Sequence, residues 1–482
     1  MSPRALIAID LGTQSLRVSA IDLEGRRLWS RQQPVATFGD GARQEQDAAA
    51  WRSEMLAGLA EAAQAGIVPA AILASGPLAG WVPVAADGAP LGPAVMYNDT
   101  RTESELSVVR AALPADAVAP RPTIADPLPH ALMLRREAPG IAARAAQFLD
   151  ATGWLNYVLT GEPTLNSYTA IRLYDGETRE RLAVTAVPFG RQVPVGSAIA
   201  PLVSALAERF GWPRVPVIAA SFDSKCAYLG SGIAAPGEAL DISGTVTSFG
   251  VVAAGPVRDV EDRIYTVPLG DRHLVRGSTA AAGSVIEWAR ACFGLDIAEL
   301  DSLSLAEPIS SDDPVFVPYL SGARAPLWHP RARGCLSGLS IATRRPALAR
   351  TIYAGLALSL RHIVETIESC GAPATSIRLA GGLARSAALS QIKADILSRP
   401  VTVLDETELT TFGLAAIGAA ALGQFPDIGT AARSFVRDAR SFVPRLDPTA
   451  ADRLYARYLK AAGLSVSLVP PAHVNNGHAS AA

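Results

Sequence analysis

The stretch Ala5-Leu-Ile-Ala-Ile-Asp10-Leu-Gly-Thr-Gln-Ser-Leu-Arg17-Val-Ser-Ala-Ile-Asp22 predicts a buried strand, a tight turn and a returning strand. Residues 5–9 are all apolar, which is typical of a strand inside a sheet that is covered on both faces. Gly12 and Thr13 form the turn, where a glycine lets backbone N–H groups approach an anion closely. The carboxylate of Asp10 stands where it could hold a hard cation bound to that anion. The alternative is a plain β-hairpin whose Asp10 and Thr13 side chains only cap the turn.

The chain has 482 residues, which is too long for one hydrophobic core and predicts two large domains. Its net charge is −2, from 43 basic and 45 acidic residues, so no nucleic acid or anionic membrane is expected as a partner. The chain enters a strand directly, without a signal peptide or an apolar run of 18 residues, and this favours a cytoplasmic protein. The four cysteines have no C-x-x-C spacing, so we expect reduced, mostly buried thiols.

Polar residues follow a later strand. Residues 45–65 predict a helix with acidic residues in its first turn, residues 71–74 a short strand, and residues 81–84 and 94–97 a hairpin. The hairpin ends at Asn98 and Asp99, and open α/β sheets bind ligands at such strand ends. The alternative role for these two side chains is N-capping of the helix that follows.

The middle of the chain repeats the opening pattern. A strand that starts at Val215 runs into a loop with Asp223, whose carboxylate either caps the next helix or serves a site. Residues 237–252 then predict strand, Ser243-Gly244-Thr245 turn and returning strand. Two Gly-Thr turns suggest two similar domains that face one phosphate chain.

A third glycine turn, Gly381-Gly382, joins a strand over residues 377–380 to a helix over residues 386–397. This geometry often approaches a nucleotide, although a plain βα connection has the same glycines. Residues 141–149, 343–369 and 450–462 predict helices, and the end of the chain from residue 470 is expected to be disordered.

Together these motifs resemble the FGGY family of carbohydrate kinases, which belongs to the superfamily of actin and hexokinase. The motifs that match are Asp10-Leu-Gly-Thr13 with Arg17, Tyr97-Asn-Asp-Thr-Arg101, Asp223, Ser243-Gly-Thr245, Pro318-Tyr-Leu-Ser-Gly-Ala-Arg-Ala-Pro326 and Gly381-Gly-Leu-Ala-Arg-Ser386. They span nearly the whole chain in the family's order, and they are more similar to the xylulokinase branch than to the glycerol kinases.

The resemblance implies an α/β fold with two ribonuclease H-like domains and an active-site cleft between them. Residues 1–236 would form the sugar-side domain with the catalytic aspartate, residues 237–440 the nucleotide-side domain, and residues 441–482 a C-terminal helix and tail. The implied reaction is ATP-dependent phosphorylation of a hydroxyl group of a small sugar, with Mg²⁺ on the phosphates.

The same resemblance implies roles for individual residues. Asp223 would be the general base and Asp10 the Mg²⁺ ligand. The residues implied to bind the nucleotide are Gly12, Thr13, Arg17, Gly244, Thr245, Gly381, Gly382 and Ser386. Those implied to line the sugar site are Leu78, Ala79, Asn98, Asp99, Asp223 and Ser224.

The sequence departs from the family pattern at four places, of which the first two bear on the substrate and the last two leave the implied reaction type unchanged. Xylulokinases carry Gln-Met-His-Gly where this chain has Pro77-Leu-Ala-Gly80, and Asn at the position of Ser224; the other two departures are Ala323 and Leu383. A pentulose or short polyol is therefore expected, with D-xylulose not presumed to be the best substrate. A kinase for another polyol, an aldonate or another ketose stays open, as do a homodimer and a non-catalytic, actin- or chaperone-like nucleotide-binding protein.

Overall fold

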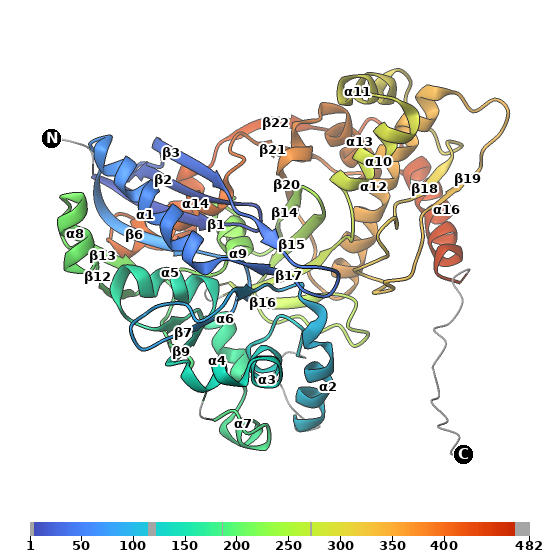
Figure 1. Cartoon of the computed structure of the whole chain (residues 1–482). Coiled ribbons are helices and arrows are strands. Elements are labelled where there is room, and N and C mark those ends of the chain that lie inside the picture. Colours follow the sequence, from blue (N-terminus) through green and yellow to red (C-terminus); the bar gives the residue numbers. More distant parts are fainter. Residues whose placement is uncertain (1–3, 114–121, 186, 270–271, 468–482) are drawn as a thin grey trace, which may run out of the picture. The chain divides into compact units, whose positions relative to one another are not determined.

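The computed structural model describes residues 4–113, 122–185, 187–269 and 272–467 (Figure 1). They group into two compact units, the first from residues 1–233 and 408–436 and the second from residues 234–407 and 437–482. The domain division predicted from the sequence put residues 408–436 in the C-terminal domain, whereas in the structure they belong to the first unit. This segment carries two helices, α14 (Leu409–Ala421) and α15 (Ile428–Phe435), whose apolar side chains are buried in the first unit.

The main sheet of the first unit is organised around β1 (Arg4–Leu11), whose residues 5–9 are all buried. Its strands run in the order β12-β13-β6-β1-β2-β3. Strand β1 is parallel to β6 and antiparallel to β2, so Asp10 at its end lies opposite Ser75 and Arg17. The other strands are β2 (Ser15–Asp22), β3 (Arg27–Pro34), β6 (Val68–Ser75), β12 (Ala198–Pro201) and β13 (Pro216–Ile218).

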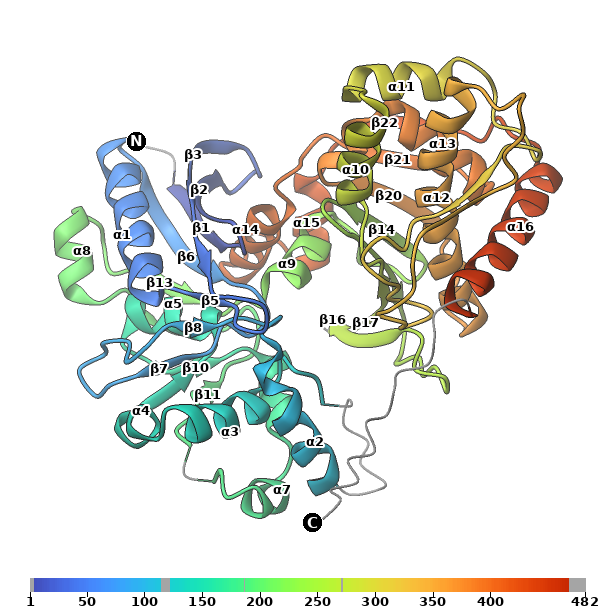
Figure 2. The ribbon, with the colours of Figure 1, turned by 45° about the vertical axis from the view of Figure 1, so that its right-hand side comes forward.

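Helices cover both faces of this sheet, as the apolar run of β1 predicts. Ile7 and Ile9 pack in one core with α1 (Ala48–Gln64), α5 (Ala151–Thr160) and α8 (Ser204–Phe210). Leu6 and Ala8 point to the other face and pack with α9 (Asp223–Gly230), α14 and α15. Figures 1 and 2 show the orange-red α14 beside the blue strands, although some 400 residues separate the two in sequence.

The rest of the first unit consists of short elements. Its short strands form three small sheets. The first consists of β4 (Thr37–Phe38), β5 (Glu45–Gln46) and β8 (Ala94–Val95). The second consists of β7 (Val82–Val84) and β9 (Gln147–Leu149), and the third of β10 (Thr164–Leu165) and β11 (Arg191–Gln192). The helices are α2 (Glu103–Ala112), α3 (Pro127–Glu137), α4 (Pro139–Arg144), α6 (Ser167–Ala170) and α7 (Gly176–Arg181), with 3₁₀ turns η1 (Thr100–Thr102) and η2 (Ile171–Leu173).

The second unit has a sheet with the order β16-β17-β15-β14-β20-β21-β22. Its strands are β14 (Glu238–Ser243), β15 (Thr247–Ala253), β16 (Tyr265–Leu269), β17 (Arg272–Ser278), β20 (Ser376–Ala380), β21 (Val401–Leu404) and β22 (Asp438–Phe442). The remaining elements are α10 (Gly283–Phe293), α11 (Ile297–Leu305), β18 (Val315–Val317), β19 (Cys335–Ser337), α12 (Arg345–Ser369), η3 (Gly382–Arg385), α13 (Ala387–Leu397) and α16 (Pro448–Ser467). The long helix α12 lies in the core, where Leu360 and Ile363 pack with Phe249 and Val251.

The two sheets repeat one strand order. In each, a central strand (β1 or β14) pairs antiparallel with the next strand and parallel with a later one (β6 or β20). A further parallel strand (β13 or β21) and an antiparallel strand (β12 or β22) follow on that side. The two Gly-Thr turns therefore occupy equivalent hairpins, and the similarity suggested by the sequence is confirmed.

Several local predictions are wrong. The helix predicted over residues 45–65 begins at Ala48 after the N-cap Asp47, because Glu45 and Gln46 form strand β5 instead. The helix predicted over residues 141–149 splits into the end of α4 and strand β9, which pairs with β7. The hairpin predicted from residues 81–84 and 94–97 forms in part, because Trp81 and Val95 exchange both backbone hydrogen bonds, at 2.9 and 3.0 Å. All four cysteines are free thiols, as expected, but only Cys226 is buried, so the prediction that most of them are buried is wrong. The chain end from residue 470 lies outside the described residues.

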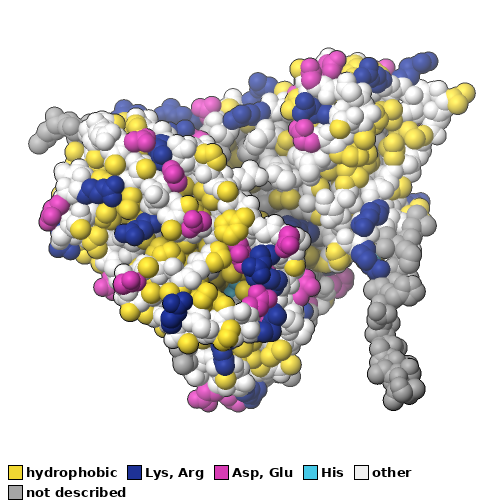
Figure 3. All heavy atoms as spheres, viewed as in Figure 1, with side chains coloured by type: hydrophobic (Ala, Val, Ile, Leu, Met, Phe, Trp, Pro, Cys, Tyr) yellow, Lys and Arg dark blue, Asp and Glu magenta, His cyan; other side chains and the backbone are white. Residues whose placement is uncertain are grey.

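No helix among the described residues is long and apolar enough to cross a membrane. On the face shown in Figure 3, basic and acidic side chains are interspersed, in keeping with the net charge of −2.

Candidate active site

Asp10 lies at the carboxyl end of β1, where the chain turns into β2. Its Oδ1 is enclosed and has no hydrogen-bond partner among the described residues. Burial, and next the negative charge of Asp223, raise the pKa of Asp10 to about 7; Glu408 adds to this, while Arg17 and Thr410 oppose it. An enclosed carboxylate oxygen without a donor, beside a second carboxylate, is an arrangement that a cation would stabilise.

Arg17 lies opposite Asp10 on β2, as the hairpin register requires. Its guanidinium donates to Gln32 Oε1 at 2.5 Å and lies 2.9 Å from Glu408 Oε1. These contacts hold the side chain in place beside Asp10. A phosphate contact of Arg17 stays a prediction.

Asp223 is the first residue of α9, and Phe222 holds the N-cap position. Its backbone N–H donates to Gly76 O at 2.9 Å, and its Oδ1 accepts from Ser224 N–H at 2.5 Å. The start of a helix stabilises a carboxylate through the helix dipole. The strand β13, the loop after it and this bond to Gly76 together place Asp223 beside Asp10 at one edge of the sheet.

The loop over residues 76–80 is fixed through its backbone. Gly76 N–H donates to Thr152 Oγ1 at 3.0 Å, and the Ala79 carbonyl accepts from Ala151 N–H at 3.0 Å. Ala79 is buried and has a φ of 70°, a left-handed conformation that only a tightly held loop imposes on alanine. Leu78 is half-buried. The loop thus offers no polar side chain of its own to a ligand.

Asn98 is exposed, whereas Asp99 is completely buried. Asp99 accepts from Gln44 N–H at 2.9 Å and from Arg101 Nη2 at 2.6 Å, and it caps η1 through Arg101 N–H at 3.1 Å. Burial acts to raise the pKa of Asp99, but these hydrogen bonds, led by that of Arg101, hold it below its ordinary value. The capping alternative is therefore observed for Asp99, and a contact of Asp99 with substrate stays a prediction.

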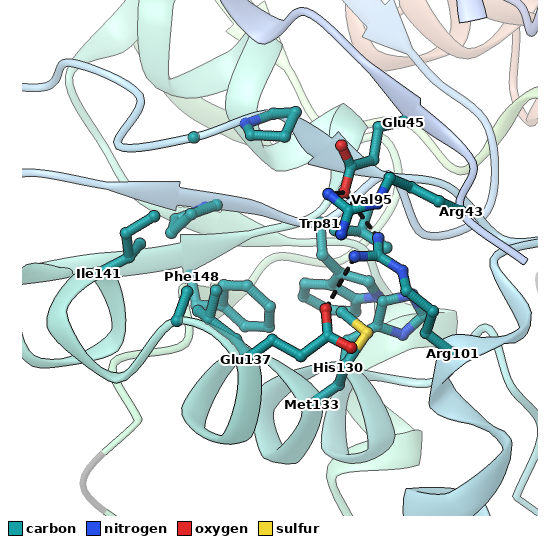
Figure 4. Close-up of a pocket in the computed structure, with 15 residues that line it drawn as sticks. Arg43, Glu45, Trp81, Val95, Arg101, His130, Met133, Glu137, Ile141 and Phe148 are labelled. Atoms are coloured by element: carbon teal, nitrogen blue, oxygen red, sulfur yellow. Dashed lines mark hydrogen bonds and ion pairs between the residues drawn. The ribbon is translucent and has the colours of Figure 1, made fainter. Parts of the chain in front are cut away.

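Arg101 also binds Glu45 at 2.6 Å and Glu137 at 2.8 Å, at the rim of a cavity of about 200 Å³ in the first unit (Figure 4). Trp81 and Phe148 stack in this cavity with ring centroids 5.0 Å apart. None of the residues predicted for the site lines it. We therefore do not assign this cavity to the site of Asp10 and Asp223.

The turn after β1 leaves backbone donors free. Gly12 N–H donates to Ser15 O at 2.8 Å, whereas no acceptor for the N–H groups of Thr13 and Gln14 is found in the part of the chain that the structure describes. Adjacent free N–H groups in a turn form a nest for an anion.

The turn after β14 has the same property. Gly244 N–H donates to Val246 O at 2.9 Å, and the Gly244 and Thr245 carbonyls accept from the start of α10. Across the described ranges, the N–H groups of Thr245 and Val246 find no protein acceptor. A Cβ on Gly244 would meet no atom within 4 Å, so this side of the turn is open.

Gly381 lies against this second turn. Its φ is 86°, and a Cβ on it would lie 2.6 Å from Ser243 O, whereas a Cβ on Gly382 would point into open space. A cavity of about 260 Å³ adjoins Gly381 and is also lined by Arg385, Asp405 and Thr407. Ser386 caps α13 by accepting from Leu389 N–H at 3.0 Å, and it donates to Asp301 at 2.8 Å.

The two domains of one known family match the two halves of the chain. The N-terminal domain of the FGGY family of carbohydrate kinases matches residues 5–230, and the C-terminal domain of that family matches residues 240–422. The chain belongs to the FGGY family of carbohydrate kinases. It is a phosphotransferase with the two-domain fold of these sugar kinases, and the resemblance found in the sequence is confirmed.

Relatives of two kinds are similar to this FGGY kinase over nearly its full length. A xylulose kinase from Staphylococcus epidermidis is 26% identical, with 92% of this chain and 93% of the relative covered. A glycerol kinase from Ectopseudomonas mendocina is 29% identical, with 95% and 98% covered. The structure of the Plasmodium falciparum glycerol kinase with ADP has the same fold, with a TM-score of 0.88 at 19% identity over 98% of this chain and 99% of that one.

Some residues of this FGGY kinase's site are not apparent from the sequence. Glu408 and Thr410 act on Asp10 from a segment some 400 residues away, and no local pattern marks them. Arg385 and Asp405 line the cavity at Gly381. Arg385 is the last residue of η3 and belongs to the motif Gly381-Gly-Leu-Ala-Arg-Ser386, so its place shortly after the glycine turn is the signal that could have identified it.

Alanine substitutions at the two glycines of the third turn are expected to differ in their effect on stability. Gly381→Ala is expected to lower the free energy of unfolding by about 1–3 kcal/mol, because alanine is strained at this φ and its methyl group would meet Ser243 O. Gly382→Ala, the matched control, is expected to change it by less than about 0.5 kcal/mol. Denaturant unfolding of both variants checks this, and equal losses would contradict the close approach of the turns.

Proposed function

We propose that this FGGY kinase transfers the γ-phosphoryl group of ATP to a hydroxyl group of a pentulose or short polyol, with Asp223 as the general base. The observation that supports this most directly is the pair of carboxylates in the first unit. Asp10 has an enclosed oxygen that no described residue hydrogen-bonds, and Asp223 stands beside it at the start of a helix. One carboxylate is suited to a cation and the other to a proton.

Asp223 would accept the proton of the attacking hydroxyl group as the new O–P bond forms and ADP departs. Phosphoryl transfer depends mainly on positioning and on stabilisation of charge, and a base adds to these by making the hydroxyl oxygen a better nucleophile. The Ser224 N–H bond and the helix start orient this carboxylate. A non-catalytic nucleotide-binding protein would need no such group.

Asp10 fits a Mg²⁺ ion that arrives with ATP, because its enclosed oxygen has no hydrogen-bond partner among the described residues. The described residues contain no group of three or more His, Cys, Asp or Glu that could hold a metal alone. Mg²⁺ is commonly held by one or two carboxylates together with substrate phosphates, so a single carboxylate can suffice. When bound, the ion would neutralise charge on the transferring phosphoryl group. Asp10 is the residue that we assign to it.

The backbone and the second cavity would bind the nucleotide. The free N–H groups of Thr13 and Gln14 in one unit, and of Thr245 and Val246 in the other, are suited to phosphate oxygens. In the cavity at Gly381, apolar residues such as Val403 would contact the base, and Asp405 offers a carboxylate to ribose hydroxyl groups.

The substrate proposal rests on the loop over residues 76–80. This loop is held by its backbone and lacks the Gln and His side chains of xylulokinases, and a site that loses such groups loses discrimination for the matching hydroxyl. Relatives named for xylulose and for glycerol are similarly close, which favours a small polyhydroxylated acceptor without choosing between them.

A panel of acceptors tests the proposal. We expect kcat/KM to be highest for a pentulose or short polyol among D-xylulose, L-xylulose, D-ribulose, ribitol, erythritol, glycerol and gluconate, with D-xylulose less than about a hundredfold ahead of the next substrate. ADP release without acceptor is the control. A larger lead of D-xylulose would show that other residues replace the missing side chains, and ADP release independent of every acceptor would overturn the kinase assignment.

A further inference from the structure

A buried ion pair lies directly behind the Ser243-Gly244-Thr245 turn of the second unit. Lys393 Nζ on α13 lies 2.5 Å from Asp241 Oδ2 on β14, and the two side chains are 3% and 0% exposed. Lys393 Nζ also donates to Ser243 Oγ at 3.0 Å. A single ammonium group thus binds both the strand that leads into the turn and the first residue of the turn.

Ser243 connects this pair to both glycine turns. Its hydroxyl donates to Asp241 Oδ1 at 2.7 Å and lies 2.9 Å from Thr247 Oγ1, on the strand that leaves the turn. Its carbonyl is the atom that Gly381 approaches so closely that no Cβ would fit. Helix α13 carries Lys393 and follows the Gly381-Gly382 turn in the chain. The network therefore joins the two turns through side chains as well as through backbone contact.

Stability alone does not account for such a pair. Taking two charges out of water costs several kcal/mol, and replacing a buried ion pair by apolar residues of similar size is often neutral or stabilising. What an apolar pair cannot do is fix the direction of the Ser243 hydroxyl and the register between β14 and α13. The geometry favours a role in placing the turns.

We propose that Lys393, with Asp241, is a positioning residue for the nucleotide. It holds the Ser243-Gly244-Thr245 turn and the Gly381-Gly382 turn in the relative position that the phosphates and the adenosine require. This rests on the proposed function, in which these two turns bind ATP. Lys393 is buried and touches no substrate, so it acts through Ser243.

The test is Lys393→Met, which keeps an unbranched side chain only one atom shorter and removes its charge. We expect the KM for ATP and the Kd for ADP each to rise about tenfold or more, while the KM for the sugar stays within about twofold. Loss of structure alone would not separate the two substrates in this way. Steady-state kinetics with each substrate varied, and calorimetric titration with Mg·ADP, provide the values.

The matched control is Arg350→Met. Arg350 forms another buried ion pair of the second unit, with Asp313 at 2.7 Å, and within the described part of the chain it has no hydrogen bond to either turn. It should lower the melting temperature at least as much as Lys393→Met while leaving the Kd for ADP within about twofold. An equal loss of ADP affinity in both variants would overturn the proposal.

Lys393→Met leaves the buried Asp241 carboxylate without its charged partner, and the variant protein can fail to fold for that reason. The double variant Asp241→Asn with Lys393→Met removes both charges and provides the test in that event. A folded double variant with the ADP affinity of the parent would overturn the positioning role. Failure of the parent protein itself to bind ADP would instead overturn the proposed function, so the two failures are distinct.

Discussion

Asp223→Asn is expected to lower kcat at least about a hundredfold, because a positioned general base contributes roughly 10²–10⁴ to the rate. The amide has the size of the carboxylate and keeps an oxygen that can accept the Ser224 N–H bond, so the start of α9 should be preserved. ADP affinity should stay within about threefold, since this residue is assigned to the hydroxyl proton and not to the nucleotide. Steady-state kinetics and titration with Mg·ADP measure the two quantities separately.

Asp150→Asn is the matched control for that experiment. Asp150 is a buried carboxylate of the same unit, and it caps α5 by accepting from Gly153 N–H at 2.7 Å. Its replacement should affect stability more than turnover, with kcat within about threefold of the parent. If Asp223→Asn retained as much activity as Asp150→Asn, Asp223 would only serve the structure of its helix.

The core of the fold could be predicted because its signals are local. The apolar run at residues 5–9 specifies a strand covered on both faces, and helices on both faces of β1 are what the structure has. The identity of those helices could not be predicted, because α14 and α15 return to the first unit from the far end of the chain. Long-range packing of this kind leaves no periodicity at the strand it covers.

Local patterns also failed where tertiary contacts compete with them. Residues 45–47 suit the first turn of a helix, yet Gln46 donates to the Thr13 carbonyl at 2.8 Å and accepts from Trp51 at 3.0 Å. Glu45 is held by Arg101. These partners lie on three different segments of the chain. Their contacts stabilise the extended conformation of residues 45–46, and a short window of the sequence does not reveal them.

The candidate site was partly predictable for the same reason. Asp10 and Asp223 follow strands that the sequence marks clearly, and the structure brings them together in the first unit. Asp99 follows a marked strand too, but its buried position and its bonds to Arg101 and Gln44 depend on partners that strand position does not specify. Ser386 likewise proves to cap a helix, a role that its place before α13 allows but does not require.

Asp10→Asn is expected to have two opposite effects, a loss of Mg²⁺-dependent turnover of at least about a hundredfold and a gain in stability of the metal-free protein. The loss follows from the assignment of this carboxylate to the cation. The gain follows from its pKa, which burial and then Asp223 raise from 3.8 to about 7 in the folded chain. A carboxyl group whose pKa is raised on folding destabilises the folded state increasingly as pH rises from about 4 to about 7.

The gain should therefore depend on pH. One pKa unit corresponds to about 1.4 kcal/mol, so the variant's advantage in free energy of unfolding should grow by up to about that amount per pH unit across this window and level off above it. Thermal unfolding in EDTA at pH 5, 6, 7 and 8 measures the advantage, and kcat against Mg²⁺ concentration measures the loss. With saturating Mg·ADP the parent should regain stability that the variant does not. Superimposable Mg²⁺ curves, together with a stability difference that is flat with pH, would instead assign Asp10 to capping its turn.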